Sequence, residues 1–317
     1  MSAIAERYGL VLAWAIVIAV FGALRPDTFL TEATFTTILG SQAVIVVLTL
    51  GLLIPLTAGD YDLSVAGVLS VSAMLLAVLN AQHGVPLGVA MLAALGAGVL
   101  TGTINGAFVL LFAIDPFIVT LGTGTVLNGV VLWISDSQTI SGVAPGLVDA
   151  VVGSRLLGIP LSFWYGLLLC AALWYVFEFT ALGRRLLFVG RGRRVAALSG
   201  FNVPRLRWGA LIASATIAAA AGIMYAGTLG GADPSSGASF LLPAFAAAFL
   251  GATGIVPGRF NPWGSIVAVY FLVTGITGLT ILGAASFVQD LFYGAALVLA
   301  VTLSQLFRRR DATRETT

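Results

Sequence analysis

The chain has no lysine, one cysteine and one histidine, and only 9% of its 317 residues are charged. Without lysine it cannot contain the GxxxxGK[ST] loop that holds phosphates in a standard ATP-hydrolysing site. The lone Cys170 cannot form an intrachain disulfide, and together with the lone His83 it leaves too few ligands for a metal centre. We therefore predict no metal, no cofactor and no catalytic residue, and the chain is not expected to be an enzyme.

Long apolar runs dominate what is present: 59% of the residues are hydrophobic and the mean hydropathy is +1.05. A helix needs about 20 apolar residues to cross a bilayer. Windows of that length predict ten segments, at 8–24, 41–57, 63–80, 86–112, 117–134, 161–180, 208–230, 240–257, 262–282 and 286–307. The segments at 63–80 and 240–257 are short or interrupted by Gly or Pro, as re-entrant segments are. The first segment lacks a small-residue cleavage site and is expected to be a retained helix.

The composition therefore predicts an all-α integral membrane protein of about ten helices. No charged, Pro-rich or Ser-rich linker divides the chain, so we expect a single transmembrane domain over 1–317. The longest polar stretch, at 181–207, and the tail at 308–317 are the expected extramembrane segments.

All fifteen basic residues are arginine, and their placement predicts the orientation of the chain. If ten spans alternate, twelve of them fall on one side: Arg7, Arg184, Arg185, Arg191, Arg193, Arg194, Arg205, Arg207, Arg308, Arg309, Arg310 and Arg314. Basic residues are enriched in cytoplasmic loops. Both termini and the 181–207 segment are thus expected in the cytoplasm of a bacterial cell, with the chain spanning the plasma (inner) membrane. No basic segment is interleaved with aromatics in a soluble module, so nucleic acid is not an expected partner.

Polar residues within this apolar chain mark the first candidate site. Asp60 and Asp62 lie between two apolar runs, where carboxylates are costly unless they cap a broken helix or line a polar cavity. Asp62 can also cap the helix that begins near Leu63. For the polar residues on apolar helices, hydrogen bonding between helices competes with lining a pathway. The pathway candidates are Asp60, Asp62, Ser64, Asn105, Thr120, Thr123 and Asn128.

Two patterns concern the arrangement of the helices. Small residues recur every fourth position in 94–106 and again in 214–230, a spacing that lets helix backbones approach closely, within one subunit or between two. Residues 63–68 and 260–265, separated by an offset of 197, each follow an apolar run that ends in a Gly-rich break. Paired interrupted helices in two halves of a chain are typical of transport pathways, so a pseudo-repeat of two halves is a hypothesis here.

The 181–207 segment is the second candidate site. Arg193 to Phe201 can form a short helix whose small apolar face comprises Val195, Ala196, Leu198 and Ser199, with Asn202 and Pro204 as stop signals. Such a helix can insert into a groove of a partner protein. Alternatively, a basic loop can lie on anionic membrane lipid.

Four ordered motifs resemble those of one known family. Gly59 to Val65 resembles the G-x-x-D-L-S-V signature of the membrane permease subunits of ribose-type (monosaccharide) ABC importers. Pro116 to Thr123 is similar to the P-F-I-V-T-L-G-T run of that family, and Gly190 to Gly200 to its cytoplasmic loop. The Gly-rich break at 251–264 lies where this family has a Gly-rich break in the second half of its sequence. The chain departs from the pattern at Asp60, Gly192, Arg194 and Phe260.

The resemblance implies a translocating subunit that imports a pentose-like or hexose-like sugar and has no catalytic site of its own. It implies three partners: an ATP-binding-cassette ATPase that uses the ATP, a periplasmic or extracellular sugar-binding protein, and a second permease copy. It also implies that the 181–207 segment couples the ATPase to the spans, through Arg193, Arg194, Ala196, Leu198, Ser199 and Gly200. An ion-coupled secondary transporter and a branched-chain amino-acid permease remain as alternatives. The sequence alone names no sugar and gives no role to Arg259 or Asp290.

Overall fold

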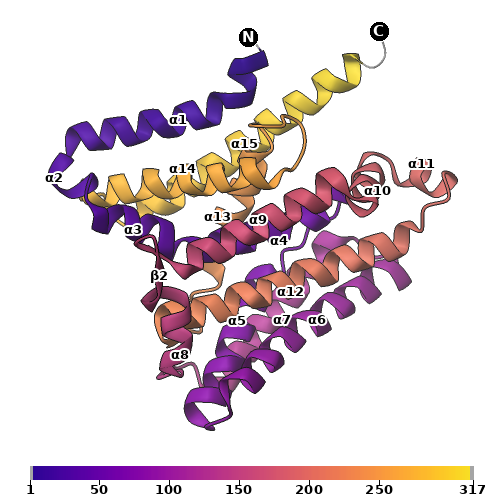
Figure 1. The fold of residues 1–317 in the computed structure, drawn as a ribbon. Coiled ribbons are helices and arrows are strands. Elements are labelled where there is room, and N and C mark those ends of the chain that lie inside the picture. The colour runs from indigo at the N-terminus through magenta and orange to yellow at the C-terminus, as the bar shows by residue number, and fades with distance from the viewer. Residues whose placement is uncertain (1–2, 315–317) are drawn as a thin grey trace.

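The computed structural model describes the backbone of residues 3–314, and helices account for most of it (Figure 1). Each predicted apolar segment coincides with a helix or with two consecutive helices. These are α1 (Ala3–Leu24), α3 (Glu32–Ser41) with α4 (Ala43–Thr57), α5 (Val65–Ala77) with the π turn η1 (Val78–Gln82), α6 (Leu87–Leu111), α7 (Pro116–Ile134), α9 (Leu161–Phe179), α12 (Val203–Leu229), α13 (Ala238–Gly251), α14 (Pro262–Ile281) and α15 (Phe287–Arg314).

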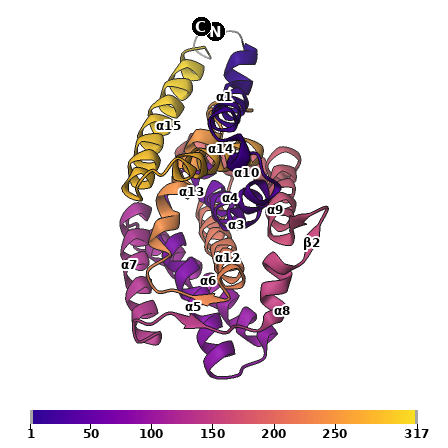
Figure 2. The ribbon, with the colours of Figure 1, turned by 90° about the vertical axis from the view of Figure 1, so that its left-hand side faces the viewer.

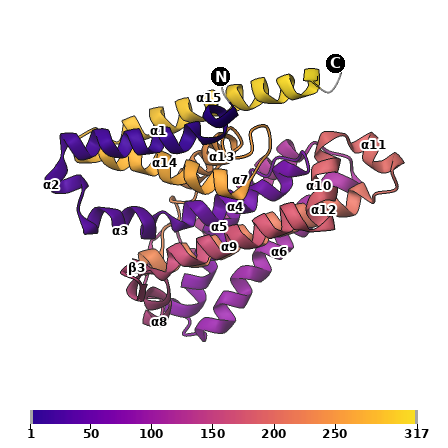
Figure 3. The same ribbon diagram turned by 45° about the horizontal axis from the view of Figure 1, so that its top comes forward.

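Short elements connect these helices. They are α2 (Pro26–Phe29), β1 (Ile140–Ser141), α8 (Pro145–Val148), the π turn η2 (Asp149–Gly153), β2 (Arg155–Leu156), β3 (Ile159–Pro160), α10 (Ala181–Arg191), α11 (Arg193–Leu198) and β4 (Gly231–Ala232). Strand β1 pairs with β4, and β2 pairs with β3, in two antiparallel two-residue ladders. Helices α10 and α11 lie at one end of the bundle, whereas α2 and α8 lie at the other (Figures 1 and 3).

Helix α4 forms the centre of the bundle (Figure 2). It is apolar on every side, as expected for a helix surrounded by others, and nearly all of its residues are buried. It packs against α9, α12, α13 and α14. Helix α1, at the edge, packs against α14 with one half-buried side and exposes the other, which is the arrangement expected of a helix at the lipid boundary. The core therefore surrounds α4, and the end of α4 at Thr57 leads directly into the first candidate site.

Small residues bring α6 and α12 together. A Cβ added at Gly98 would lie 2.6 Å from the carbonyl oxygen of Ala215, and one added at Gly102 would lie 2.6 Å from the Cα of Ile212. Gly222, farther along α12, packs against the backbone of α5 at Leu69. The predicted small-residue spacing is thus used for close packing within this chain.

Within the described residues, eight helical segments are long and apolar enough to cross a membrane, and α13 and α15 add shorter apolar stretches. This confirms the predicted class, an all-α integral membrane protein. The segment that begins near residue 240 is a 14-residue helix, α13, with Pro243 inside it. Of the predicted tail, residues 308–314 continue α15, and residues 315–317 lie outside the described part.

Candidate functional site

The segment of residues 58–64, called the first break, separates α4 from α5. Gly59 adopts a left-handed conformation (φ +82°) directly after the C-cap of α4, where glycine commonly ends a helix. The N–H of Asp60 then donates to the carbonyl oxygen of Pro55 (2.9 Å). Helix α5 begins at Val65, so the break exposes several backbone groups to hydrogen bonding by side chains.

Asp60 is a buried carboxylate that two arginines hold in place. Arg207 holds it in a bidentate pair, with Nε 2.7 Å from Oδ2 and Nη2 2.8 Å from Oδ1. Nη2 of Arg193 lies 2.6 Å from Oδ1 and also donates to the carbonyl oxygen of Gly59 (2.8 Å). The Asp60 side chain is 0% exposed, against 12% for Arg207 and 44% for Arg193. Removing one partner from such a buried pair typically costs about 3–5 kcal/mol.

Asp62 belongs to a second polar group two residues along the chain. Its Oδ1 accepts hydrogen bonds from the N–H (3.1 Å) and the hydroxyl (2.6 Å) of Ser64, immediately before α5. This is close to the predicted capping role, although the bonded N–H is that of Ser64 and not one inside the helix. Nδ2 of Asn105, from α6, donates to the Ser64 hydroxyl (2.9 Å). Asp62, Ser64 and Asn105 are all fully buried.

This second group keeps unused hydrogen-bonding capacity. Among the described residues, Asn105 Oδ1 has no hydrogen-bond partner, and Asp62 Oδ2 and the Ser214 hydroxyl, which lie close to each other, form no hydrogen bond of standard geometry. Ser214, from α12, is fully buried and lies beside Asp62. Unsatisfied buried oxygens are uncommon in folded proteins and mark places where a polar ligand is favourable.

Thr120 attaches the first break to α7. Its hydroxyl oxygen accepts a hydrogen bond from the N–H of Leu63 (3.0 Å), while the hydroxyl lies 2.7 Å from the carbonyl oxygen of Pro116, its closest acceptor. Thr123 is half-buried farther along α7, and Asn128 is exposed beyond it. The structure therefore brings Asp62, Ser64, Asn105 and Thr120 together and leaves Thr123 and Asn128 outside the group.

Residues 181–207, called the basic segment, contact the first break from the bundle end. A Cβ at Gly190 in α10 would overlap the carbonyl oxygen of Thr57, so α10 packs directly on the last turn of α4. Ala196 in α11 is buried against Val189 and Val203. Leu198, by contrast, is 83% exposed. Thus α11 is anchored to the protein by one side and presents an apolar residue on the other.

The predicted short helix is confirmed, with two corrections. It ends at Leu198 and not at Phe201, and Gly200 follows in a left-handed conformation (φ +83°). Asn202 and Pro204 do not stop α11 but start α12, where the Asn202 side chain accepts from the N–H of Arg205 (3.1 Å). The residues of the expected apolar face are also divided between the protein interior and the surface.

Ala196 points inward, whereas Arg193, Arg194, Val195, Leu198, Ser199 and Gly200 are exposed.

A second interruption, residues 252–261 and called the second break, separates α13 from α14. The side chain of Asn261 occupies its centre: Oδ1 accepts from the N–H of Gly264 (2.7 Å), and Nδ2 donates to the carbonyl oxygens of Gly251 (3.1 Å) and Arg259 (3.1 Å). Arg259 lies 3.4 Å from Glu178 at the end of α9. The packing of α14 against α9 brings Arg259 and Glu178 together, so this pair could not be predicted from sequence.

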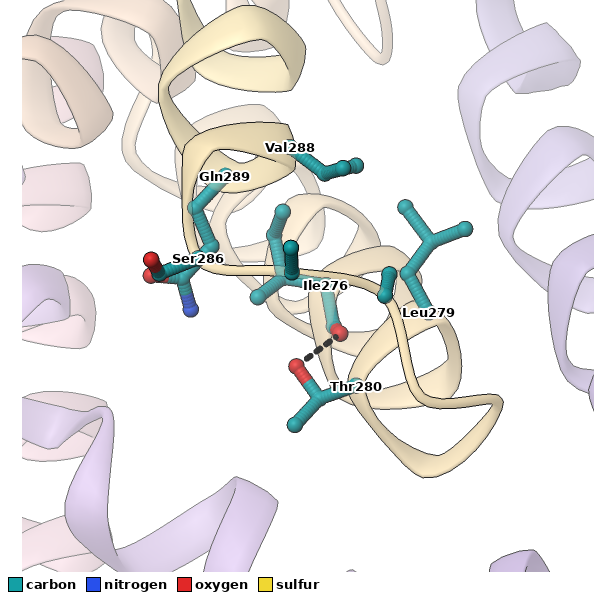
Figure 4. Close-up of a pocket in the computed structure, with 8 residues that line it drawn as sticks. Ile276, Leu279, Thr280, Ser286, Val288 and Gln289 are labelled. Carbon is teal, nitrogen blue, oxygen red and sulfur yellow. Dashed lines mark hydrogen bonds between the residues drawn. The ribbon is translucent and has the colours of Figure 1, made fainter.

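The bundle also has a pocket (Figure 4), at the end away from α10 and α11 (Figure 1). It lies between the end of α14 and the start of α15, has a volume of about 280 Å³, and is lined by Ile276, Thr280 and Gln289 among others. The Thr280 hydroxyl donates to the carbonyl oxygen of Ile276 (2.9 Å), as Figure 4 shows. None of the predicted pathway residues lines it.

Comparison of the sequence with known proteins assigns this chain to a family. Residues 34–301 match the family model described as the permease component of the branched-chain amino acid transport system. The chain is 30% identical to the D-allose transport system permease protein of Escherichia coli K12 over 304 residues, which cover 96% of this chain and 93% of that protein.

Two further relatives have closely similar coverage. The ribose import permease protein of Bacillus subtilis 168 is 29% identical, over 95% of this chain and 93% of its own length. The fructose import permease protein of Rhizobium meliloti is 30% identical, over 91% of this chain and 82% of its own length. No solved structure matches significantly. With a family model matching most of its length and relatives aligned nearly end to end, the chain belongs to the family of multi-pass permeases of monosaccharide-type ABC importers.

Proposed function

We propose that this chain is the translocating subunit of an importer that carries a monosaccharide into the cytoplasm, energised by a separate ATPase subunit. The relatives named for allose, ribose and fructose support a sugar as the cargo. The observation that carries the proposal is the direct attachment of an exposed basic segment to a polar helix break. Such an attachment lets a force applied outside the bundle reach polar groups inside it.

The exposed side of α11 is the proposed docking surface for the ATPase. Arg194 and Arg205 add positive charge beside the apolar side chains of Val195 and Leu198, and all four are exposed. A short helix with an apolar centre and a basic rim fits a groove with an acidic border. The partner chemistry is therefore an ATPase with an acidic cleft.

The orientation follows from the charges at this end of the bundle. The basic segment carries seven of the fifteen arginines. The positive-inside rule places this end, together with both termini, in the cytoplasm. The opposite end, with the β1–β4 ladder and the pocket between α14 and α15, then faces the external sugar-binding protein. Two permease copies, two ATPase subunits and one binding protein complete the proposed assembly.

Two other cargo or energy assignments have observations in their favour. The description of the matching family model names branched-chain amino acids. The buried Asp62, with one oxygen that forms no hydrogen bond of standard geometry among the described residues, would suit an ion-coupled carrier. The proposed sugar importer differs from the amino-acid permease in its cargo and from the ion-coupled carrier in needing ATP.

The decisive experiment is reconstitution of the chain in liposomes, with and without its partner ATPase and sugar-binding protein. We expect uptake of radiolabelled allose, ribose or fructose only when all three components and internal ATP are present. Uptake by the chain alone, driven by a sodium or proton gradient, would contradict the proposal, and ATP-dependent uptake of leucine but no sugar would reassign the cargo.

A further inference from the structure

Asp60 joins two parts of the molecule that are far apart in the sequence. Arg193 is the first residue of α11 and Arg207 lies near the start of α12, separated from Asp60 by 133 and 147 positions. The exposed part of the basic segment, with Leu198 and Gly200, lies between these two arginines. A single carboxylate therefore holds the segment on both sides of its exposed loop.

The attachment is strong at the break and weaker toward the surface. Both oxygens of Asp60 are engaged by the guanidinium of Arg207, which is mostly buried, in a geometry that fixes direction as well as distance. Arg193 adds a more exposed contact to the same Oδ1 and to the carbonyl oxygen of Gly59. If the basic segment moves, separating this pair would leave a buried carboxylate without a counter-charge, so movement of the break with the segment is favoured.

The break passes such a movement on to two other helices. Two residues from Asp60, Asp62 bonds Ser64, which bonds Asn105 of α6. The N–H of Leu63 bonds Thr120 of α7. The first break is thus bonded to the basic segment on one side and to α6 and α7 on the other, with only two or three residues between.

We propose that Asp60 is the positioning residue that couples the two sites: it transmits displacement of the basic segment to the first break and so to the polar group around Asp62. The inference rests on the proposed function, since the ATPase supplies the displacement. Asp60 touches no sugar in this account. Its carboxylate acts only through Arg193 and Arg207.

The test measures ATP hydrolysis and sugar uptake together, in liposomes containing the complete importer. In Asp60→Asn we expect ATP hydrolysis to continue while the sugar imported per ATP falls about tenfold, within the range usual for coupling between two sites. Arg207→Gln should give the same loss. Because both changes break one interaction, the double variant Asp60→Asn with Arg207→Gln should be no worse than either single variant.

Two further variants keep the test decisive. Arg191→Gln removes an exposed arginine at the end of α10, outside the proposed docking surface, and serves as the matched control, with a ratio within about twofold of the unmodified protein. Arg193→Gln removes the exposed arginine of the group and leaves the buried Asp60–Arg207 pair intact, so it should fold even if Asp60→Asn does not, and should show a smaller loss in the same direction.

The outcomes separate this inference from the proposed function. If the unmodified importer shows no ATP-dependent uptake, the proposed function fails. If it does, and Asp60→Asn and Arg193→Gln keep its sugar-to-ATP ratio, the inference alone is overturned. A proportional fall of hydrolysis and uptake together, with an unchanged ratio, would likewise overturn it, because that pattern reports lost assembly and not lost coupling.

Discussion

The two breaks use the same backbone device for different attachments. Each follows a helix with an internal proline, and each contains a glycine in the left-handed conformation, Gly59 and Gly258, both with φ +82°. The first break is held by a buried carboxylate between two arginines. The second is held by a neutral amide, Asn261, and its ion pair is long and partly exposed. The difference is that the first interruption is bound to the basic segment, whereas the second is bound to the rest of the bundle.

The partners of the two breaks follow the same division. The first break is bonded to the basic segment and to α6 and α7. The second is bonded to α1, where the N–H of Ile255 donates to the carbonyl oxygen of Arg7 (2.8 Å), and contacts the end of α9 through Glu178. A chain of aromatic rings lies between them: Tyr61 stacks on Phe249 with centroids 6.4 Å apart, and Phe249 packs edge-on against Phe260 at 5.3 Å.

Apart from changes to the Asp60 pair, the largest effect on stability is expected in the second break. Asn261→Ala removes one acceptor and both amide donors from a fully bonded buried site, a loss of about 3 kcal/mol at roughly 1 kcal/mol per hydrogen bond. Thermal melting of the detergent-solubilised subunit should show it. Asn128→Ala, which removes an exposed amide on α7, is the matched control. Equal melting temperatures for the two variants would show that Asn261 does not anchor the second break.

The next largest effect on stability is expected where the basic segment packs on α4. Gly190→Ala places a methyl group against the carbonyl oxygen of Thr57, and the two backbones must separate at a cost of about 1–3 kcal/mol. We expect lowered uptake with normal membrane insertion. Gly209→Ala in α12, where no atom lies within 4 Å of the added methyl, should behave like the unmodified protein. If Gly190→Ala also behaves so, α10 does not need its close contact with the first break.

Asp62 gives an intermediate effect. Asp62→Ala removes the acceptor for the N–H and hydroxyl of Ser64 and should cost about 2 kcal/mol, with a matching loss of uptake. Asp62→Asn keeps an acceptor oxygen, caps nearly as well, and should retain most of the uptake at a cost below about 1 kcal/mol. Loss of uptake in both variants, with normal melting, would instead indicate that the Asp62 charge contacts the cargo or a coupling ion.

The smallest effect is expected for the ion pair of the second break. Glu178 and Arg259 are 36% and 30% exposed and 3.4 Å apart, and pairs of this kind contribute at most about 1 kcal/mol. Glu178→Gln should leave uptake and melting nearly unchanged. A loss of uptake as large as that of Asp60→Asn would show that the two breaks do not differ in this respect.

The helices could be predicted from sequence because the length of an apolar run is a local property. Residues 161–179, for example, form a helix almost where the hydropathy placed it. The gathering of Asp62, Ser64 and Thr120 was predictable in kind, since polar groups in an apolar bundle seek one another. Asn128 was not distinguishable from them, because its exposure depends on which face of α7 meets the bundle.

The partners of charged residues could not be predicted. Glu178 pairs with Arg259 of the second break and not with Arg184 or Arg185, which are nearer in sequence, and the guanidinium of Arg185 lies over the ring of Phe201 at 6.0 Å. Asp60 was expected to face the pathway, and the structure shows both of its oxygens bound to the basic segment. Such pairs join residues more than 80 positions apart, where no spacing rule applies.

Distances between spin labels in the assembled importer show directly whether the first break moves with the basic segment. Labels would be placed at Tyr61→Cys in the first break and Leu198→Cys in α11, both exposed positions, in a Cys170→Ala background. A second pair would join Leu198→Cys to Val256→Cys in the second break. We expect the distance from 61 to 198 to stay constant between the nucleotide-free and ATP-bound states while the distance from 256 to 198 changes, and Asp60→Asn to make the first distance variable. A first distance that changes on ATP binding while the second stays constant would contradict the account.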